Sequence, residues 1–88
     1  MESKKLVDLV RTFIWESFVP NEQPESLTED LDLIDSGVLD SLAMVEVADF
    51  LEGLSGVPIE THELTRRNIG SIGAMVRFVS SRQVAASS

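Results

Sequence analysis

Apolar residues recur every three or four positions in the first part of the chain, which is the period of a helix with one buried face. The spacing predicts a helix over residues 4–18, with Ser3 as a candidate cap at its beginning. Pro20 and the polar residues 21–24 end this helix. The positions that we expect to face the core are Leu6, Val7, Leu9, Val10, Phe13, Ile14 and Phe18.

A second amphipathic stretch predicts a helix over residues 41–54, with Asp40 as its N-cap and Gly56 near its end. The positions expected to be buried are Met44, Val47, Ala48, Leu51 and Leu54, with Phe50 beside them. Another face of the same helix carries Leu42, Val45, Glu46, Asp49 and Glu52.

The remaining segments complete an all-α pattern. Residues 19–40 form a long connection in which apolar residues alternate with acids, so we expect an ordered loop that packs on the helices. A short helical turn between residues 63 and 69 precedes a last helix over about 72–82. The sequence therefore predicts a four-helix bundle with three main helices, a short third helix and a long first loop. We expect one domain over residues 1–82 and a flexible C-terminal tail over 83–88.

The charge is strongly acidic and unevenly distributed. Seven Lys and Arg residues stand against fifteen Asp and Glu residues, which gives a net charge of -8. Residues 21–60 contain eleven acids and no Lys or Arg. This distribution argues against nucleic acids and anionic membranes as partners, because both need basic groups. The acids either keep a small domain soluble or form a docking surface for basic partners, and composition leaves both interpretations open.

The chain has no cysteine, so disulfides and thiolate metal sites are excluded. No apolar run approaches the ~20 residues that a membrane-spanning helix needs, so we expect no membrane insertion. The first residues do not show the pattern of a secretory signal, and we expect a cytoplasmic protein.

Ser41 is the candidate site for covalent chemistry. It directly follows the predicted N-cap Asp40, where free backbone N–H groups and the helix dipole would suit a phosphate ester on its hydroxyl oxygen. Leu39 and Leu42 would place apolar surface beside an attached chain. The triplet of residues 40–42 is also typical of simple helix capping, so these three residues leave both interpretations open.

Residues 32–47 resemble the attachment motif of acyl and peptidyl carrier proteins, and the likeness covers about residues 4–82. The resemblance implies a four-helix carrier fold and a 4'-phosphopantetheine arm on Ser41. A phosphopantetheinyl transferase would attach the arm, using magnesium and coenzyme A. The thiol of the arm would carry an acyl or aminoacyl group as a thioester, and the chain itself would not be an enzyme and would hold no catalytic residues.

The resemblance also implies where partners dock. By their position in the motif, Leu42, Val45 and Glu46 belong to the helix face that partner enzymes touch, with Asp49 on the same face. Asp40 would help to dock the transferase. The other partners implied are a loading enzyme (an adenylating enzyme or an acyltransferase) and downstream synthase, tailoring or transferase enzymes. The carrier is expected to be monomeric.

The sequence of residues 36–42 resembles the corresponding segment of free-standing carriers of specialised pathways and of D-alanyl carriers more than that of fatty-acid synthesis carriers. We therefore expect a dissociated pathway of the specialised-metabolite, polyketide or nonribosomal-peptide type.

Other residue patterns carry weaker hypotheses. His62 has no visible nucleophile or metal partner and is expected at the surface, and the acidic pairs lack the order of a calcium loop, so no metal site is predicted. Arg66 and Arg67 would contact either a partner or the chain's own acids. A hydrolase with Ser41 as nucleophile lacks a histidine base and a glycine elbow. The rival from another class is a cofactor-free acidic helical adaptor that binds a basic protein.

Overall fold

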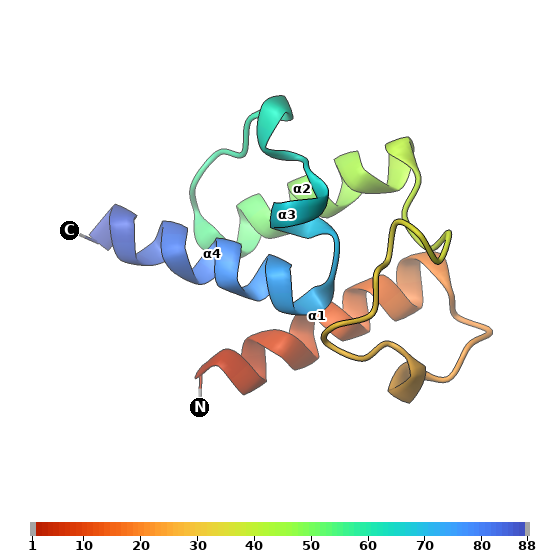
Figure 1. Cartoon of the computed structure of the whole chain (residues 1–88). Helices are drawn as coiled ribbons and strands as arrows, with labels where there is room; N and C mark the ends of the chain where they lie inside the picture. The colour runs from red at the N-terminus through yellow and green to blue at the C-terminus, as the bar shows by residue number, and fades with distance from the viewer. Residues whose placement is uncertain (1, 88) are drawn as a thin grey trace.

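Four α-helices surround one apolar core in the computed structural model, which describes residues 2–87 (Figure 1). Within these residues there is no strand. The elements in chain order are α1 (Glu2–Phe18), the 3-10 helix η1 (Pro24–Ser26), α2 (Ser41–Ser55), the 3-10 helix η2 (Thr61–Glu63), α3 (Arg66–Ile69) and α4 (Ile72–Ser87). The structure confirms the predicted all-α bundle of three main helices with a short third helix.

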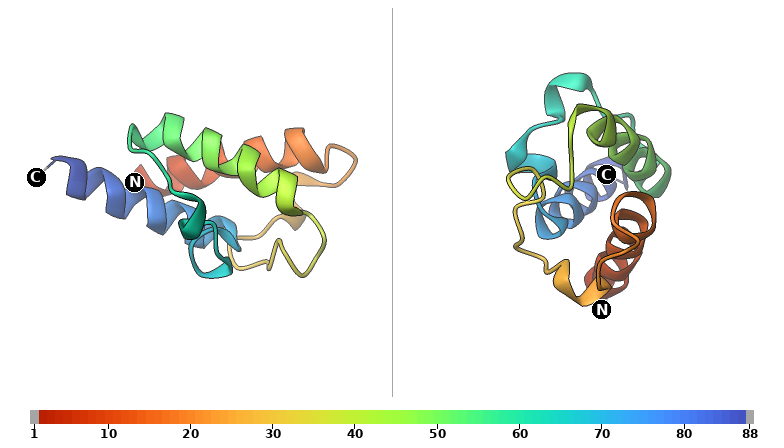
Figure 2. Two further views of the ribbon diagram at one scale, coloured as in Figure 1. Left: turned by 90° about the horizontal axis from the view of Figure 1, so that it is seen from above. Right: turned by 90° about the vertical axis from the view of Figure 1, so that its right-hand side faces the viewer.

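α4 is the helix around which the others pack. It contacts α1, α2 and α3. In the left view of Figure 2, α4 runs along the lower side of the bundle, and α1 and α2 run along the upper side. Its inward side is fully buried at Ile72, Met75 and Val79. The side chains of α1 and α2 that complete the core without exposed surface include Val10, Ile14, Val47 and Leu51.

Two ends of helices differ from the prediction. α1 begins at Glu2, so Ser3 lies inside the first turn instead of capping it. α4 continues to Ser87, so the backbone of residues 83–87 extends the last helix beyond its predicted end at residue 82. Small residues such as the alanines of this segment are good helix formers, and their lack of apolar periodicity hid the extension. Ser88, the last residue of the predicted tail, lies outside the described residues.

The predicted packing faces are correct in outline, with three differences. Leu9 was expected in the core but is 45% exposed on the outer side of α1. Met44 and Leu54 are half-buried, and Ala43, next to Met44, is buried although it was not among the predicted core positions. Phe50 packs on α1 as a stacked pair with Phe13, with 4.1 Å between ring centroids, and so closes the outer edge of the α1–α2 contact.

The long first loop is ordered by contacts with the rest of the bundle, as predicted. Leu27, Leu33 and Leu39 are buried in the core, and the Leu33 N–H donates to the Gly70 carbonyl at 2.8 Å. The Leu39 N–H in turn donates to the Leu33 carbonyl at 2.9 Å, which closes the loop on itself. Gly37 lies between these two residues with a φ of 87°, a conformation that favours glycine. The loop therefore delivers Asp40 and Ser41 to the beginning of α2 in a defined path.

No helix within residues 2–87 is both long enough and apolar enough to cross a bilayer.

Candidate functional site

Ser41 is the first residue of α2 and is exposed. Its hydroxyl makes no hydrogen bond with any described residue, and the backbone N–H groups of Ser41 and Leu42 also meet no acceptor there. Free N–H groups at the beginning of a 15-residue helix carry the positive end of its dipole. These N–H groups and the helix dipole favour negative charge on a group attached to the hydroxyl oxygen of Ser41.

Asp40 is the N-cap of α2, as predicted. Its Oδ1 accepts from the Ala43 N–H at 2.8 Å, and its carbonyl accepts from the Met44 N–H at 2.9 Å. The backbone of Asp40 is extended, which turns the chain from the loop into the helix. This geometry fixes the position of the next residue, Ser41, and leaves its side chain outside the capping interaction.

Of the two leucines expected to place apolar surface beside Ser41, only Leu42 does so. Leu42 is 70% exposed and offers apolar surface next to the serine. Leu39 is only 3% exposed, because the hydrogen bond from its N–H to Leu33 pulls it into the core. The prediction that Leu39 borders an attached chain is therefore wrong.

A shallow depression lies where the end of α1, the first loop and the beginning of α2 meet, and it is lined by the two neighbours of Ser41, Asp40 and Leu42, but not by Ser41 itself. It has a volume of about 360 Å³. Phe18 and Val38 supply apolar walls, while Asp40 and Glu46 supply carboxylates. A flexible chain on Ser41 thus has both an open solvent path and a partly apolar surface within reach.

Four of the five predicted docking residues lie together on the outer face of α2, while the fifth, Asp40, precedes the helix as its N-cap. Leu42, Val45, Glu46 and Asp49 follow the spacing i, i+3, i+4 and i+7, and all four are exposed. Val45 is 52% exposed, so it presents a second apolar side chain to solvent one turn after Leu42. We call these four residues the α2 face. This face consists of two apolar side chains near Ser41, Leu42 and Val45, followed along the helix by two acids, Glu46 and Asp49.

Glu52 shares the predicted face with these residues, but its carboxylate is engaged in a contact within the chain. It is half-buried, and its Oε2 accepts from the Ile59 N–H at 2.7 Å. This bond ties the link after α2 back to the helix and satisfies a backbone donor that would otherwise be unpaired. The sequence offered no signal for this role, because the two residues meet only when the chain turns after Gly56.

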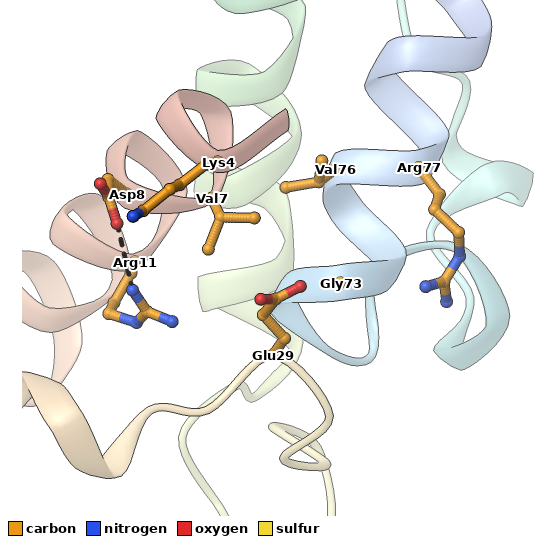
Figure 3. A pocket seen from close by; sticks show the side chains of 8 residues that line it. All are labelled: Lys4, Val7, Asp8, Arg11, Glu29, Gly73, Val76 and Arg77. Carbon is orange, nitrogen blue, oxygen red and sulfur yellow. Dashed lines mark hydrogen bonds and ion pairs between the residues drawn. The ribbon is translucent and has the colours of Figure 1, made fainter. Parts of the chain in front are cut away.

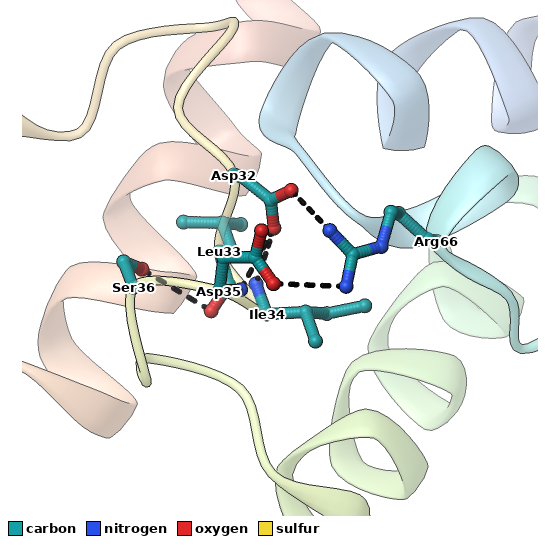
Figure 4. A network of polar contacts seen from close by, with 6 residues as sticks. All are labelled: Asp32, Leu33, Ile34, Asp35, Ser36 and Arg66. Carbon is teal, nitrogen blue, oxygen red and sulfur yellow. Dashed lines mark hydrogen bonds and ion pairs between the residues drawn. The ribbon is translucent and has the colours of Figure 1, made fainter.

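Arg66 holds the first loop against α3 (Figure 4). Its Nη1 donates to Asp32 Oδ2 at 2.6 Å, and its Nη2 donates to Asp35 Oδ1 at 2.9 Å. The hydrogen bond and charge of Arg66 lower the pKa of Asp35, and the two carboxylates raise the pKa of Arg66. Asp32 also accepts from the backbone N–H groups of Ile34 and Asp35, which shapes the turn before Gly37.

These contacts decide between the two alternatives for Arg66, which contacts the chain's own acids. Asp32 and Asp35 precede Arg66 by 34 and 31 residues, so sequence spacing alone gave no sign of the pairing. Arg67 next to it is exposed and has no ion pair within the described part of the chain.

The acids closest to Ser41 remain unpaired. No ion pair of the described side chains involves Asp40, Glu46 or Asp49. Arg66 of α3 pairs with acids of the first loop and Arg82 of α4 pairs with Glu63, so neither of these cations neutralises the acids near Ser41. The negative potential beside Ser41 is therefore available to a basic partner surface.

Two other kinds of chemistry have no support around Ser41. His62 lies exposed in η2, and it forms no hydrogen bond with Ser41. Among the described residues, no group of three or more His, Cys, Asp or Glu side chains is placed to hold a metal ion.

The residues present fit a phosphopantetheine group on Ser41. Ser41 is exposed and its hydroxyl is free, the backbone N–H groups of Ser41 and Leu42 are unpaired at the beginning of the helix, and Asp40 and Leu42 line a nearby depression. Comparison with models of known protein families and with curated proteins gave no match to this chain. The likeness to carrier proteins therefore depends on the motif residues and on their place in the fold.

Proposed function

We propose that this protein is a carrier that tethers acyl or aminoacyl intermediates as thioesters on a 4'-phosphopantetheine arm at Ser41. The observation that carries the proposal is the exposed, unpartnered hydroxyl of Ser41 at the beginning of α2, next to free backbone N–H groups. A serine that served only as a cap would accept from a backbone N–H of the first turn, whereas here Asp40 does so by accepting from the Ala43 N–H.

The roles of the chain's own residues follow from this arrangement. Ser41 supplies the oxygen that forms the phosphoester bond, and the nucleotide part of coenzyme A leaves. The N–H groups of Ser41 and Leu42, with the dipole of α2, stabilise the phosphate charge by about 0.3–1 kcal/mol. When bound, the arm supplies the thiol that holds the cargo, since the chain has no cysteine.

Partner enzymes would recognise the α2 face. Its apolar pair, Leu42 and Val45, gives a small contact area, and Glu46 and Asp49 attract basic surfaces. Weak, electrostatically led contacts suit a shuttle that exchanges partners, which would be the transferase, a loading enzyme and the downstream enzymes of a dissociated pathway. Tethering then raises the concentration of the intermediate at each active site. We infer a cytoplasmic monomer in this role.

The test is loading by a promiscuous phosphopantetheinyl transferase with magnesium and coenzyme A, followed by mass spectrometry of the intact protein. We expect a mass increase of one phosphopantetheine, which Ser41→Ala abolishes. Ser36→Ala is the matched control, because Ser36 is an exposed serine of the loop that precedes Ser41 and its replacement should leave loading intact. Circular dichroism of each variant shows whether it is folded.

The rival function, an acidic helical adaptor without a cofactor, predicts a different result. The unpaired acids of the α2 face would also serve such an adaptor. An unmodified, folded wild-type protein after this incubation would contradict the carrier proposal and favour the adaptor. If Ser41→Ala is still loaded and Ser36→Ala is not, the arm is attached to Ser36, and the assignment to Ser41 is wrong.

A further inference from the structure

A second concave surface lies between α1, α4 and the first loop (Figure 3). Its volume is about 520 Å³, and it is lined by three cations and two carboxylates. Lys4, Asp8 and Arg11 come from one side of α1, where the spacing i, i+4 and i+7 aligns them, and Arg77 comes from α4. Glu29 enters from the loop. We call this surface the α1–α4 pocket.

Two of its cations have no partner. Lys4 and Arg77 are exposed and form no hydrogen bond or ion pair within the described part of the chain. Arg67 is also exposed and unpaired, but it lies outside this pocket. Lys4 and Arg77 are placed on either side of a hollow, so an anionic group between them would find two charged donors.

The third cation is fixed in place. Arg11 Nε donates to the Leu27 carbonyl at 2.9 Å, and its Nη1 donates to Asp8 Oδ1 at 3.2 Å. Its side chain is only 26% exposed. Arg11 therefore forms a rigid part of the wall, and its pairing removes Asp8 as a competitor for an incoming anion.

The pocket is preformed by the close approach of the loop to α4. The Gly73 N–H donates to the Glu29 carbonyl at 2.9 Å, and a Cβ at residue 73 would lie 3.1 Å from that carbonyl oxygen. The glycine thus allows the loop to lie directly on the helix. A pocket that exists before binding loses less conformational entropy when a ligand is bound.

Glu29 limits the chemistry of the ligand. Its carboxylate points into the space between α1 and Gly73, with Arg11 on one side and Arg77 on the other (Figure 3). A compact polyanion such as a phosphate would meet repulsion there. A ligand that combines carboxylates with N–H donors would satisfy the cations and Glu29 together. An acidic peptide has both kinds of group.

The pocket is separate from Ser41. The α1 residues of the pocket lie around position 8, while the depression beside Ser41 is reached at Ser17 and Phe18. Ten residues of helix correspond to about 15 Å. The screening length is about 10 Å at 0.1 M salt, so the acids near Ser41 have little effect at the pocket.

We propose that the α1–α4 pocket binds an acidic peptide segment of a partner protein. The carboxylates of the segment pair with Lys4 and Arg77, and its backbone N–H groups face Glu29. Because this surface lies away from Ser41, the protein can be held by one partner while Ser41 and the α2 face remain accessible to another. The proposal does not depend on the modification of Ser41.

The experiment is an NMR titration of the ¹⁵N-labelled full chain with a hexaglutamate peptide blocked at both ends, at about 0.1 M salt. We expect saturable shifts of amides around Lys4, Arg11, Glu29 and Arg77, and weaker binding as salt is raised. Lys4→Glu and Arg77→Glu should each weaken binding roughly fivefold or more. Arg67→Glu is the matched control, since it makes the same charge change at an exposed, unpaired arginine outside the pocket.

Three results would overturn the proposal. The first is an absence of saturable shifts at the pocket, and the second is a loss of affinity in Arg67→Glu equal to that in Arg77→Glu, which would indicate net charge alone. The third is equally tight binding of pyrophosphate, which would identify a general anion site. Ser41→Ala should bind the peptide like the wild type, so failure of arm loading and failure of this proposal are distinguishable.

Discussion

Asp40 has a structural role that is separable from its place beside Ser41. Its carboxylate accepts from the Ala43 N–H at 2.8 Å and caps the first turn of α2. Asp40→Ala removes this acceptor and leaves the Ala43 donor to water. It also removes a negative charge from the positive end of the helix dipole. Asp40→Asn removes the charge but retains a side-chain oxygen that can cap the helix.

The expected magnitude follows from these two contributions. Loss of an N-cap costs about 1 kcal/mol, with a range of roughly 0.5–2 kcal/mol. Asp40→Ala should therefore lower the free energy of unfolding by about 1–2 kcal/mol. For a domain of this size, that corresponds to a fall in the melting temperature of roughly 4–16 °C. Asp40→Asn should lose only the charge contribution, about 0.3–1 kcal/mol.

Urea denaturation followed by circular dichroism at neutral pH measures these differences. Asp49→Ala is the matched control, because Asp49 is an exposed, unpaired acid in the interior of the same helix and alanine is a good helix former. Its stability should stay within about 0.5 kcal/mol of the wild type. An Asp40→Ala variant as stable as the wild type, or an Asp49→Ala variant destabilised equally, would refute the capping argument.

The same variants test the proposed docking role of Asp40. Asp40→Asn should remain folded yet be loaded more slowly by the transferase, because the charge beside Ser41 is lost. Initial loading rates at several salt concentrations measure this effect. Equal rates for Asp40→Asn and the wild type at low salt would show that Asp40 acts only as a cap.

Three further predictions concern the core, the loop and the α2 face. Leu51→Ala should lower the free energy of unfolding by about 2–5 kcal/mol, because this side chain has no exposed surface, and a loss under about 1 kcal/mol in urea would contradict the packing. Arg66→Ala should remove the interaction that lowers the pKa of Asp35. In the wild type, this interaction stabilises the fold above the ordinary pKa of the carboxyl, and the stabilisation is lost as the pH falls through the lowered pKa. The free energies of unfolding of the wild type and the variant should therefore become equal in acid. Urea denaturation at a series of pH values measures this. Reversing Glu46 and Asp49 to Lys should slow a native loading enzyme by about tenfold or more while the melting temperature changes little, and an unchanged rate would exclude the α2 face as the docking surface.

The periodicity of apolar residues correctly predicted the main helices, because an amphipathic helix records its buried face in its own sequence. The cap at Asp40 was also predictable, since the capping group and the helix that it caps are neighbours in the chain. The exposure of Leu42, Val45, Glu46 and Asp49 followed from the same periodicity. In each case the controlling contacts span no more than a few residues.

Only the tertiary structure decided the contacts between distant segments. Leu9 and Leu39 have the same side chain, yet Leu9 is exposed on the outer side of α1, whereas Leu39 is buried because the first loop folds it into the core. Arg66 pairs with a loop more than thirty residues earlier, and the α1–α4 pocket combines residues from three segments. The sequence by itself determined which helices form and where Ser41 lies on one of them. The packing of the loop and α4 decided which cations are neutralised and which remain free, because that depends on distances that local spacing does not encode.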